Sequence, residues 1–373
     1  MTVSDILKRD KNNLDIVRII VATMVIWSHS FALSQGNGAN EPLSRFLKVT
    51  YAGELGVNIF FFISGLLVTN SILKKGSITK FVVSRFFRIF PALLLLLVIT
   101  TFIIGPIVSK LSVIEYFSNS ATWKYFLQNI YLKTNYILPG SFENNIWPND
   151  VNGSLWSLTY EVACYIFLIV VFVLSGNNKN TQNKIIFVII ILSIIPNHFL
   201  LHFFERTYIP GFVPMACFAF GSFFAVNQEK IKLDFKLLFA LVLSLVLFWR
   251  YIHLIQILFP LTISVFLLFF STDKFVLKLK PKYDISYGLY IWHFLIQQII
   301  ILYIGSFNVY LFFIVSFVLT VLLAFLSFVL VEERSINYGY KLGNRIVNSG
   351  FNYERLIIYS VVIIGGIILA KLI

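Results

Sequence analysis

The first long apolar run, residues 14–33, constrains the fold more than any other part of the chain. Its sequence, LDIVRIIVATMVIWSHSFAL, is long enough to cross a bilayer as a helix. It also contains three ionisable side chains, Asp15, Arg18 and His29. Exposing any of them to lipid would cost several kcal/mol, so they must face protein or water. The sequence therefore predicts a helical membrane bundle assembled around polar groups.

The composition supports this prediction. Hydrophobic residues make up 58% of the 373 residues and charged residues 13%, about half the charged fraction of a soluble domain. We expect an all-α, polytopic membrane protein that forms one domain over residues 1–373, with a core at about 14–331. Its predicted spans, about ten or eleven, are 14–33, 51–73, 89–108, 154–175, 184–204, 208–226, 236–251, 253–271, 285–304, 308–331 and an additional C-terminal helix at 356–372.

The distribution of basic residues predicts the orientation. With a cytoplasmic N-terminus, the cytoplasmic segments contain 22 of the 30 Lys and Arg residues, as the positive-inside rule requires. The net charge of +13 then reflects topology, and no nucleic-acid partner is expected. Because the leader before residue 14 contains no short apolar region with a cleavage site, we expect the first helix to be retained.

No metal site is expected. Cys164 and Cys217 lie in separate apolar runs, so they suggest neither a disulfide framework nor a cysteine metal site. His198 and His202, with Glu205 following, have a spacing that can chelate zinc, but no ligands beyond these are identified at the end of this predicted span.

Arg18 and His29 share one face of the first predicted helix. His29 follows Arg18 by eleven positions, which gives about 16 Å along the axis at almost the same angle. Asp15, three residues before Arg18, can pair with it as structural support. With a cytoplasmic N-terminus, the imidazole of His29 lies in the outer half of the membrane and is a candidate general base.

The fourth predicted span places Glu161 at a depth similar to that of His29. This span enters from outside, Glu161 is about two turns in, and Ser157 lies one turn above it on the same face. A buried carboxylate beside an imidazole would orient it for general-base catalysis. Alternatively, Glu161 bonds a nearby Trp or hydroxyl and only holds helices together.

Arg85 and Arg88 are three residues apart at the predicted cytoplasmic mouth. Two guanidinium groups on one helical face suit a polyanion such as a nucleotide phosphate. The alternative is that both arginines set topology or contact lipid headgroups.

Two other spans contain polar candidates. In the second span, Glu54 and Asn58 lie near the outer surface, while Ser64 and Gly65 lie deeper, where small residues allow close approach of a helix or ligand. In the ninth span, His293 lies about 12 Å from the cytoplasmic edge. It either lines a path from the inside or bonds a neighbour.

Five sequence elements, taken together, resemble the integral-membrane acyltransferase type 3 family. The family's arginine, ten residues, then histidine matches Arg18 and His29, and its two arginines separated by two residues match Arg85 and Arg88. The other three elements read GVNIFFFISG, SLWSLTYE and ISYGLYIWH in this chain. Leu66 departs from the pattern, because the family more often has Phe after the Ser-Gly pair.

This resemblance implies a stand-alone O-acetyltransferase that spans the bacterial inner membrane several times. The donor would be cytoplasmic acetyl-CoA, and the acceptor a sugar hydroxyl of an extracytoplasmic or lipid-linked glycan of the O-antigen or exopolysaccharide type. The expected donor contacts are Arg85, Arg88, Arg18 and His293; the expected acceptor contacts are Glu54, Asn58 and Ser157. His29 and Glu161 would be catalytic, with direct transfer and an acyl-histidine intermediate both open. A homo-oligomer is also left open.

Two other functions remain alternatives. A transporter or flippase of lipid-linked glycans also places ionisable residues at mid-depth, but it needs no thioester donor. A glycan polymerase would use the long outer loop, residues 109–153, and would change polymer length instead of acetyl content.

Overall fold

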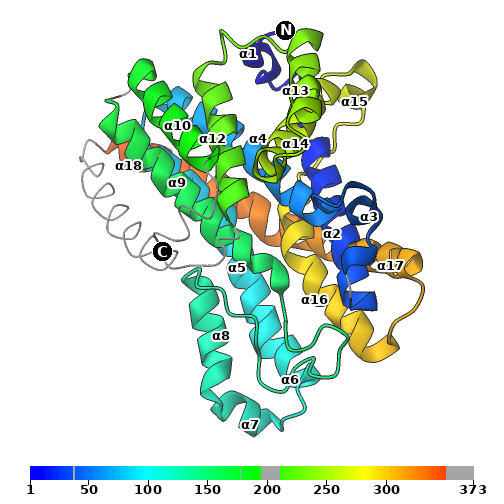
Figure 1. The fold of residues 1–373 in the computed structure, drawn as a ribbon. Coiled ribbons are helices and arrows are strands. Elements are labelled where there is room, and N and C mark those ends of the chain that lie inside the picture. Colours follow the sequence, from blue (N-terminus) through cyan, green and yellow to red (C-terminus); the bar gives the residue numbers. More distant parts are fainter. Residues whose placement is uncertain (37, 177, 195–210, 350–373) are drawn as a thin grey trace.

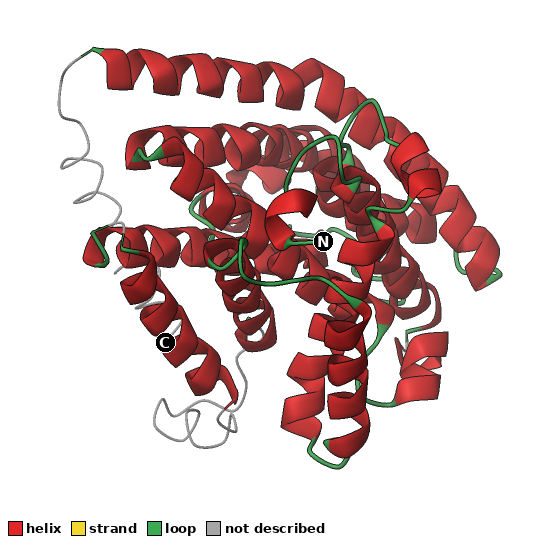
Figure 2. Ribbon diagram, turned by 90° about the horizontal axis from the view of Figure 1, so that it is seen from above, coloured by secondary structure: helices red, strands yellow, loops and turns green. Residues whose placement is uncertain are grey.

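The computed structural model describes residues 1–36, 38–176, 178–194 and 211–349. Over these residues the regular secondary structure is helical, with only isolated β-bridges and no strand, as Figures 1 and 2 show. The predicted all-α class is therefore confirmed. The additional helix predicted at 356–372 and the His198–His202 spacing lie outside the described residues.

Seven helical segments of the described chain are long and apolar enough to cross a membrane. They comprise α2 (Leu14–Gln35), α4 (Ala52–Lys75), α5 with η2 and α6 (Ile78–Val98, Ile99–Ile104, Gly105–Val108), η3 with α9 (Gly153–Leu155, Trp156–Leu174), α14 (Ile252–Phe270), α16 (Ser286–Ile304), and α17 with η4 and α18 (Val309–Ser327, Phe328–Glu332, Glu333–Asn348).

Two more predicted spans coincide with shorter helices, α12 (Phe212–Val226) and α13 (Phe235–Leu247). Helix α10 (Lys179–Ile194) covers the described part of the span predicted at 184–204. Helix α13 has 13 residues, which gives about 20 Å, less than the roughly 30 Å of a hydrocarbon core. The prediction that 236–251 forms a full span is therefore not met by this helix.

The third span begins earlier than predicted. Helix α5 starts at Ile78, where the side chain of Ser77 caps it by accepting from the backbone N–H of Lys80. Residues 78–88 are therefore helical, and Pro91 lies inside the helix instead of in its first turn. The capping serine follows directly after Gly76, whose left-handed backbone ends α4, so the two helices are joined by a very short turn.

The segment after the tenth span is helical instead of a connector. A π-helical turn, η4, joins α17 to α18, and the resulting long bent helix runs along one side of the bundle (Figure 2). Glycines allow α18 to lie against α5: a Cβ at Gly339 would be 2.6 Å from the side chain of Phe87. This contact brings Ile336 and Tyr340 of α18 to the cavity described below.

The long predicted loop, 109–153, contains two helices, α7 (Val113–Ser118) and α8 (Ser120–Ile130), at one end of the molecule (Figure 1). Its last part is held against α16 by Gln298, whose amide donates to the carbonyl oxygens of Trp147 at 2.9 Å and Asp150 at 2.6 Å. In return, the side chain of Asn145 donates to Gln298. This segment is therefore anchored to the helix that carries His293.

The core of the bundle depends on a very close crossing of α4 and α12, the most extensively packed pair of helices. A Cβ at Gly65 would be 2.1 Å from the carbonyl oxygen of Phe218, and one at Gly221 would be 2.1 Å from that of Phe62. Gly65 therefore serves helix packing, one of the two roles that the sequence left open. Helix α2 packs against α4 and also against α16.

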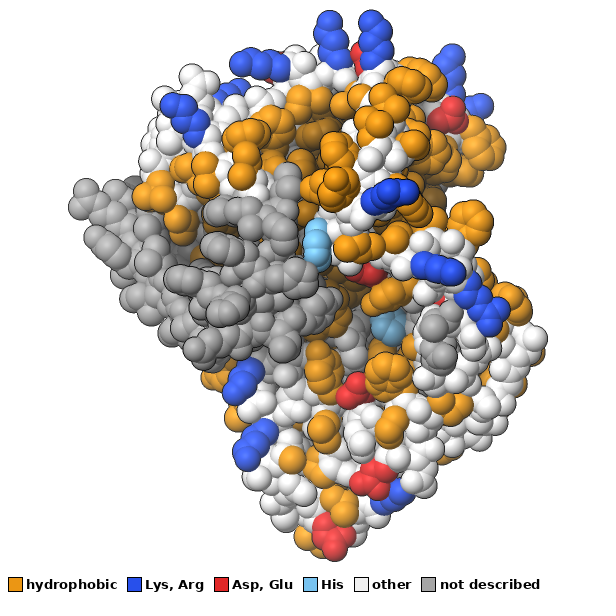
Figure 3. Space-filling model, in the orientation of Figure 1, with side chains coloured by type: hydrophobic (Ala, Val, Ile, Leu, Met, Phe, Trp, Pro, Cys, Tyr) orange, Lys and Arg blue, Asp and Glu red, His pale blue; other side chains and the backbone are white. Residues whose placement is uncertain are grey.

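Basic side chains gather at the opposite end from α7 and α8. Figure 3 shows Lys and Arg over the end that carries α1 (Val3–Ile6) and α15 (Lys274–Lys278), with a broad hydrophobic zone below them. The start of α2 is tied to this end, because the side chain of Asn13 donates to the carbonyl oxygen of Val276 at 2.7 Å. Arg18 therefore lies nearer the basic end than His29 does.

Candidate active site

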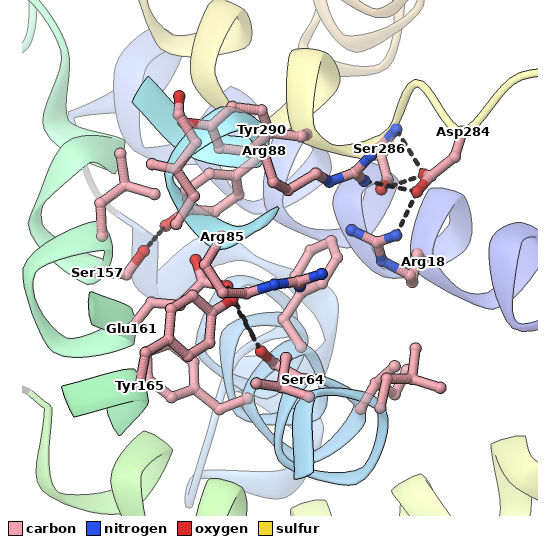
Figure 4. A pocket seen from close by; sticks show the side chains of 18 of the residues that line it. Arg18, Ser64, Arg85, Arg88, Ser157, Glu161, Tyr165, Asp284, Ser286 and Tyr290 are labelled. Atoms are coloured by element: carbon pink, nitrogen blue, oxygen red, sulfur yellow. Dashed lines mark hydrogen bonds and ion pairs between the residues drawn. The ribbon is translucent and has the colours of Figure 1, made fainter. Parts of the chain in front are cut away.

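Two of the predicted arginines converge on one carboxylate, that of Asp284, between α15 and α16. Arg88 of α5 donates to Asp284 Oδ2 at 2.6 Å, and Arg18 of α2 donates to the same oxygen. The other oxygen, Oδ1, accepts from the hydroxyl of Ser286 at 2.6 Å, as Figure 4 shows. Arg18 therefore pairs with Asp284, and the pairing predicted between Arg18 and Asp15 is wrong.

Asp284 lies in the connector just before α16, and its environment fixes its charge. Burial raises the pKa of its carboxyl, but the two arginine charges lower it, and so do the hydrogen bonds from Ser286 and Arg88. The pKa consequently lies well below its usual range. Asp284 is therefore an anion at neutral pH and clamps α2, α5 and α16 together.

Arg85 differs from the other two arginines. It forms no hydrogen bond or ion pair with another of the described residues, and its Nε atom is buried without a partner there. A buried guanidinium nitrogen without an acceptor is costly. Arg85 is thus the cation with spare hydrogen-bonding capacity at this site, while Arg18 and Arg88 are already engaged.

Glu161 and Ser64 lie on the other side of the same site. The hydroxyl of Tyr165 donates to Glu161 Oε1, and the hydroxyl of Ser64 lies 3.5 Å from that oxygen and 3.3 Å from the hydroxyl of Tyr165. Ser64, predicted as structural support, therefore faces a polar cluster (Figure 4). Glu161 bonds neighbouring hydroxyls, as the alternative interpretation of its role required.

Tyr290 and Ser157 form a third contact at the site. The hydroxyl of Tyr290 lies 2.9 Å from the carbonyl oxygen of Ser154 and 2.6 Å from the hydroxyl of Ser157. A carbonyl can only accept, so Tyr290 donates to Ser154 and accepts from Ser157. This pair bridges α16 and the start of α9.

These groups line one cavity of about 390 Å³. The polar side chains that line it include Arg18, Ser64, Arg85, Arg88, Ser157, Glu161, Tyr165, Asp284, Ser286 and Tyr290 (Figure 4). The structure therefore brings Arg85 and Arg88 into contact with the same space as Glu161 and Ser157. Since α5 starts at Ile78, both arginines lie about two to three turns inside that helix and not at its mouth.

The two histidines lie beyond this cavity and bond each other. Nε2 of His293 is 3.1 Å from Nδ1 of His29, and the ring centroids are 5.0 Å apart. Neither residue lines the cavity. Tyr290 stands between, because it lines the cavity while its ring centroid lies 6.1 Å from that of His293. The neighbour that contacts His29 is therefore His293, and the contact predicted from Glu161 is wrong.

The other predicted residues are placed elsewhere. Glu54 accepts from the hydroxyl of Thr50 at 3.1 Å, and Asn58 is only 2% exposed. Neither they nor Asp15 and Gly65 line the cavity. Ser157 does line it, beside the arginines, so a ligand that it contacts there is also within reach of the basic groups.

Sequence reasoning missed Asp284, Tyr165 and Tyr290 as parts of the site. Asp284 had a signal in the sequence: an acid two residues before Ser286, at the end where the arginines were expected, is the natural counter-charge for them. Tyr290 lies within the ISYGLYIWH element, one turn before His293. Among the described residues, no group of three or more acidic, Cys or His side chains could hold a metal ion.

Comparisons with known proteins show the family of this chain. The O-acetyl transferase of Shigella phage Sf6 is 29% identical over 87% of this chain and 95% of its own length. Nodulation protein 10 of Rhizobium leguminosarum bv. viciae is 30% identical over 42% of this chain and 43% of its own. No solved structure matches the chain. A family model described as an acyltransferase domain matches residues 11–329, so the chain belongs to this acyltransferase family and is a multi-pass membrane enzyme that transfers an acyl group.

Proposed function

We propose that the enzyme transfers acetyl from cytoplasmic acetyl-CoA to a sugar hydroxyl of an extracytoplasmic or lipid-linked glycan, at the bacterial inner membrane. Family membership and a relative named as an O-acetyl transferase support the reaction class. The observation that carries the donor assignment is Arg85, a cation without a partner among the described residues, aimed at a cavity beside two further arginines.

The donor occupies the arginine cavity. Phosphate oxygens of coenzyme A accept from Arg85, which satisfies its buried Nε and its free N–H groups. The arginines that line the cavity are Arg18, Arg85 and Arg88, and the carboxylates that line it are those of Asp284 and Glu161, so the charge along the cavity also favours an anion. The basic end of the molecule in Figure 3 faces the cytoplasm by the positive-inside rule, which puts the cavity on the side where acetyl-CoA is made.

The acetyl group must pass Tyr290 to reach the histidines. This residue and Ser157 both line the cavity, and their hydroxyls hydrogen-bond each other at 2.6 Å. A neutral hydrogen bond contributes only about 0.5–1.5 kcal/mol, so rotation of Tyr290 is an accessible way to open the passage. In this proposal the thioester arm displaces the bond between Tyr290 and Ser157 as it enters.

His29 is the general base. Its Nε2 atom contacts no hydrogen-bonding group among the described residues, and its ring is only partly buried. Nε2 takes the proton from the sugar hydroxyl while that oxygen forms a bond to the acetyl carbonyl carbon. The bond from carbon to sulfur then breaks, and the thiolate leaves as coenzyme A, which takes up a proton. In the competing mechanism Nε2 itself attacks and carries the acetyl group.

The glycan approaches along the segment that ends the long outer loop. Residue Ile146 lies against Gly36, which ends α2 a few residues after His29: a Cβ at Gly36 would be 3.1 Å from the Ile146 side chain. The neighbouring Trp147 is 40% exposed and offers a flat ring for a sugar. Glu54, near the outer start of α4, supplies a second wall.

Coenzyme A binding by the purified protein tests the proposal. We expect coenzyme A to raise the thermal midpoint, and Arg85→Gln to weaken its binding about tenfold or more, since charged hydrogen bonds contribute roughly 1.5–3 kcal/mol. Arg45→Gln removes an equal charge from an exposed arginine that bonds Asn40 and is the matched control. A coenzyme A affinity that is the same for Arg85→Gln as for wild type contradicts the donor assignment. If coenzyme A stabilises neither the wild type nor any variant, the result would favour a transporter or a polymerase.

A further inference from the structure

The hydrogen bonds of His293 determine which of its nitrogens carries a proton. Nδ1 lies 2.8 Å from the carbonyl oxygen of Tyr290 and 3.2 Å from that of Leu289. Carbonyl oxygens only accept, so Nδ1 of His293 must be the N–H donor. The residue has no exposed surface, and a second proton on its ring would point at His29. Nε2 of His293 is therefore an unprotonated acceptor.

The same reasoning then fixes the tautomer of His29. Its Nδ1 lies 3.1 Å from the carbonyl oxygen of Val25 and 3.1 Å from Nε2 of His293. Both partners are acceptors, so Nδ1 of His29 carries the proton and shares it between them. Its other nitrogen, Nε2, then has a free lone pair.

We propose that His293 is a positioning residue that holds His29 in the tautomer with Nδ1–H, so that Nε2 is the base. This inference deepens the proposed function and rests on it. A neutral imidazole here takes the place that a carboxylate has in other catalytic triads, where the acceptor on Nδ1–H sets the ring's tautomer and orientation. The two carbonyl oxygens keep the proton of His293 on Nδ1, so its Nε2 is free to accept from His29.

The hydrogen bond between the two histidines also stabilises His29 after it has accepted a proton. When Nε2 of His29 accepts the proton of the sugar hydroxyl, the ring becomes an imidazolium whose Nδ1–H still points at the lone pair on His293. That hydrogen bond becomes charge-assisted and stronger. No proton moves to His293, because its Nδ1 already carries one. The proton on His29 later leaves to the coenzyme A thiolate or to water.

Nitrogen NMR is the first test, and it determines the tautomers of both histidines in the wild-type protein. With ¹⁵N-labelled histidine in lipid bilayers, protonated and unprotonated ring nitrogens give widely separated signals. Spectra of His29→Gln and His293→Gln only assign them. We expect Nδ1 to be protonated and Nε2 unprotonated on both rings. A proton on Nε2 of His29 would overturn the proposal.

Two substitutions at position 293 form the second test. Gln can place its side-chain oxygen near the former Nε2 and keep an acceptor for His29, whereas Leu cannot. We expect His293→Leu to lower the rate of acetyl transfer to membrane glycan about a hundredfold and to shift His29 towards the tautomer with Nε2–H. His293→Gln should retain at least about ten times more activity than His293→Leu. His253→Gln, at a histidine outside the pair, controls for loss of a ring.

The outcomes separate this inference from the proposed function. If His29→Gln stays active, the proposed base is wrong, whatever tautomer the spectra show. A second outcome is that His29→Gln is inactive while His293→Leu, shown by size-exclusion chromatography to be folded, keeps its activity and the wild-type tautomer of His29. In that case the assignment of His29 as the base is correct and the role proposed for His293 is wrong. If His293→Leu does not fold, the tautomers of the wild-type rings still decide the inference.

Discussion

Nε2 of His293 lies 3.1 Å from Nδ1 of His29, and this contact joins α16 to α2 near the middle of the bundle. It is the only histidine pair that the described residues bring together. Tyr290 lines the arginine cavity, and its ring centroid lies 6.1 Å from that of His293, so this residue lies between the basic groups and the imidazole pair.

The clamp at Asp284 should control stability. In Asp284→Asn, Arg18 and Arg88 lose a shared carboxylate in a largely buried site, where removing one partner of an ion pair costs about 3 kcal/mol or more. We expect a lower thermal midpoint in detergent for this variant. Asp273→Asn is the control, since Asp273 is an exposed N-cap of α15 and Asn caps equally well. Equal midpoints for both variants would contradict the clamp.

The same clamp predicts how stability depends on pH. The pKa of Asp284 in the folded protein lies below its usual range, and an unperturbed Asp has a pKa of about 3.9. The ion pairs therefore stabilise the fold above about pH 4, and this contribution is lost as the pH falls further. Thermal melts from pH 7 to pH 3 should show a steeper acid loss for wild type than for Asp284→Asn. Parallel curves of thermal midpoint against pH for the two proteins would contradict a stabilising role for the Asp284 ion pairs.

The hydrogen bond between Tyr290 and Ser157 should restrain passage from the arginine cavity to the histidine pair. Tyr290→Phe removes the hydroxyl that Ser157 and Ser154 share and keeps the ring. Loss of neutral hydrogen bonds of about 0.5–1.5 kcal/mol each corresponds to a roughly two- to tenfold change. We expect acetyl-CoA hydrolysis without acceptor to rise by about that factor, measured as thiol release. Hydrolysis at the wild-type rate would show that this hydroxyl does not gate the path.

The close crossing of α4 and α12 should tolerate no side chain at Gly65. A Cβ there would be 2.1 Å from the backbone oxygen of Phe218, which cannot move aside cheaply. We expect Gly65→Ala to lower both the folded yield and the thermal midpoint. Gly343→Ala is the matched control, because its nearest atom would be at an ordinary 3.5 Å and Ala favours a helix over Gly by about 1 kcal/mol. A stable Gly65→Ala protein would contradict the tight crossing.

Much of the architecture could be predicted because lipid imposes a simple rule. Apolar runs of about 20 residues mark spans, and most predicted spans coincide with helices. The boundaries were less accurate where polar residues continue a helix. Arg85 and Arg88 were expected before the third span, yet they lie inside α5, since buried partners such as Asp284 allow charges there. Likewise, the sequence of α18 predicts a connector, because its polar residues do not indicate that its glycines pack the helix against α5.

The residues of the site could be predicted better than their contacts. Arg18, Arg85, Arg88, Ser157 and Glu161 do line one cavity. However, helical spacing gives only the face and depth of a side chain, not the neighbouring helix that it meets. Glu161 and His29 were expected at one depth and therefore in contact, but Glu161 bonds the hydroxyls of Ser64 and Tyr165, and His29 bonds His293. Pairings across the bundle depend on helix rotation, which a single sequence does not determine.

The acetyl content of surface glycans tests the central claim most directly. Cells without the gene would be complemented with wild type or with His29→Gln, at matched levels of folded protein in the membrane, and their polysaccharides compared by mass spectrometry and proton NMR. The account predicts that wild type restores a glycan acetyl group that the deletion removes, and that His29→Gln leaves the glycan as in the deletion. Restoration of the acetyl group to the wild-type level by His29→Gln would contradict it.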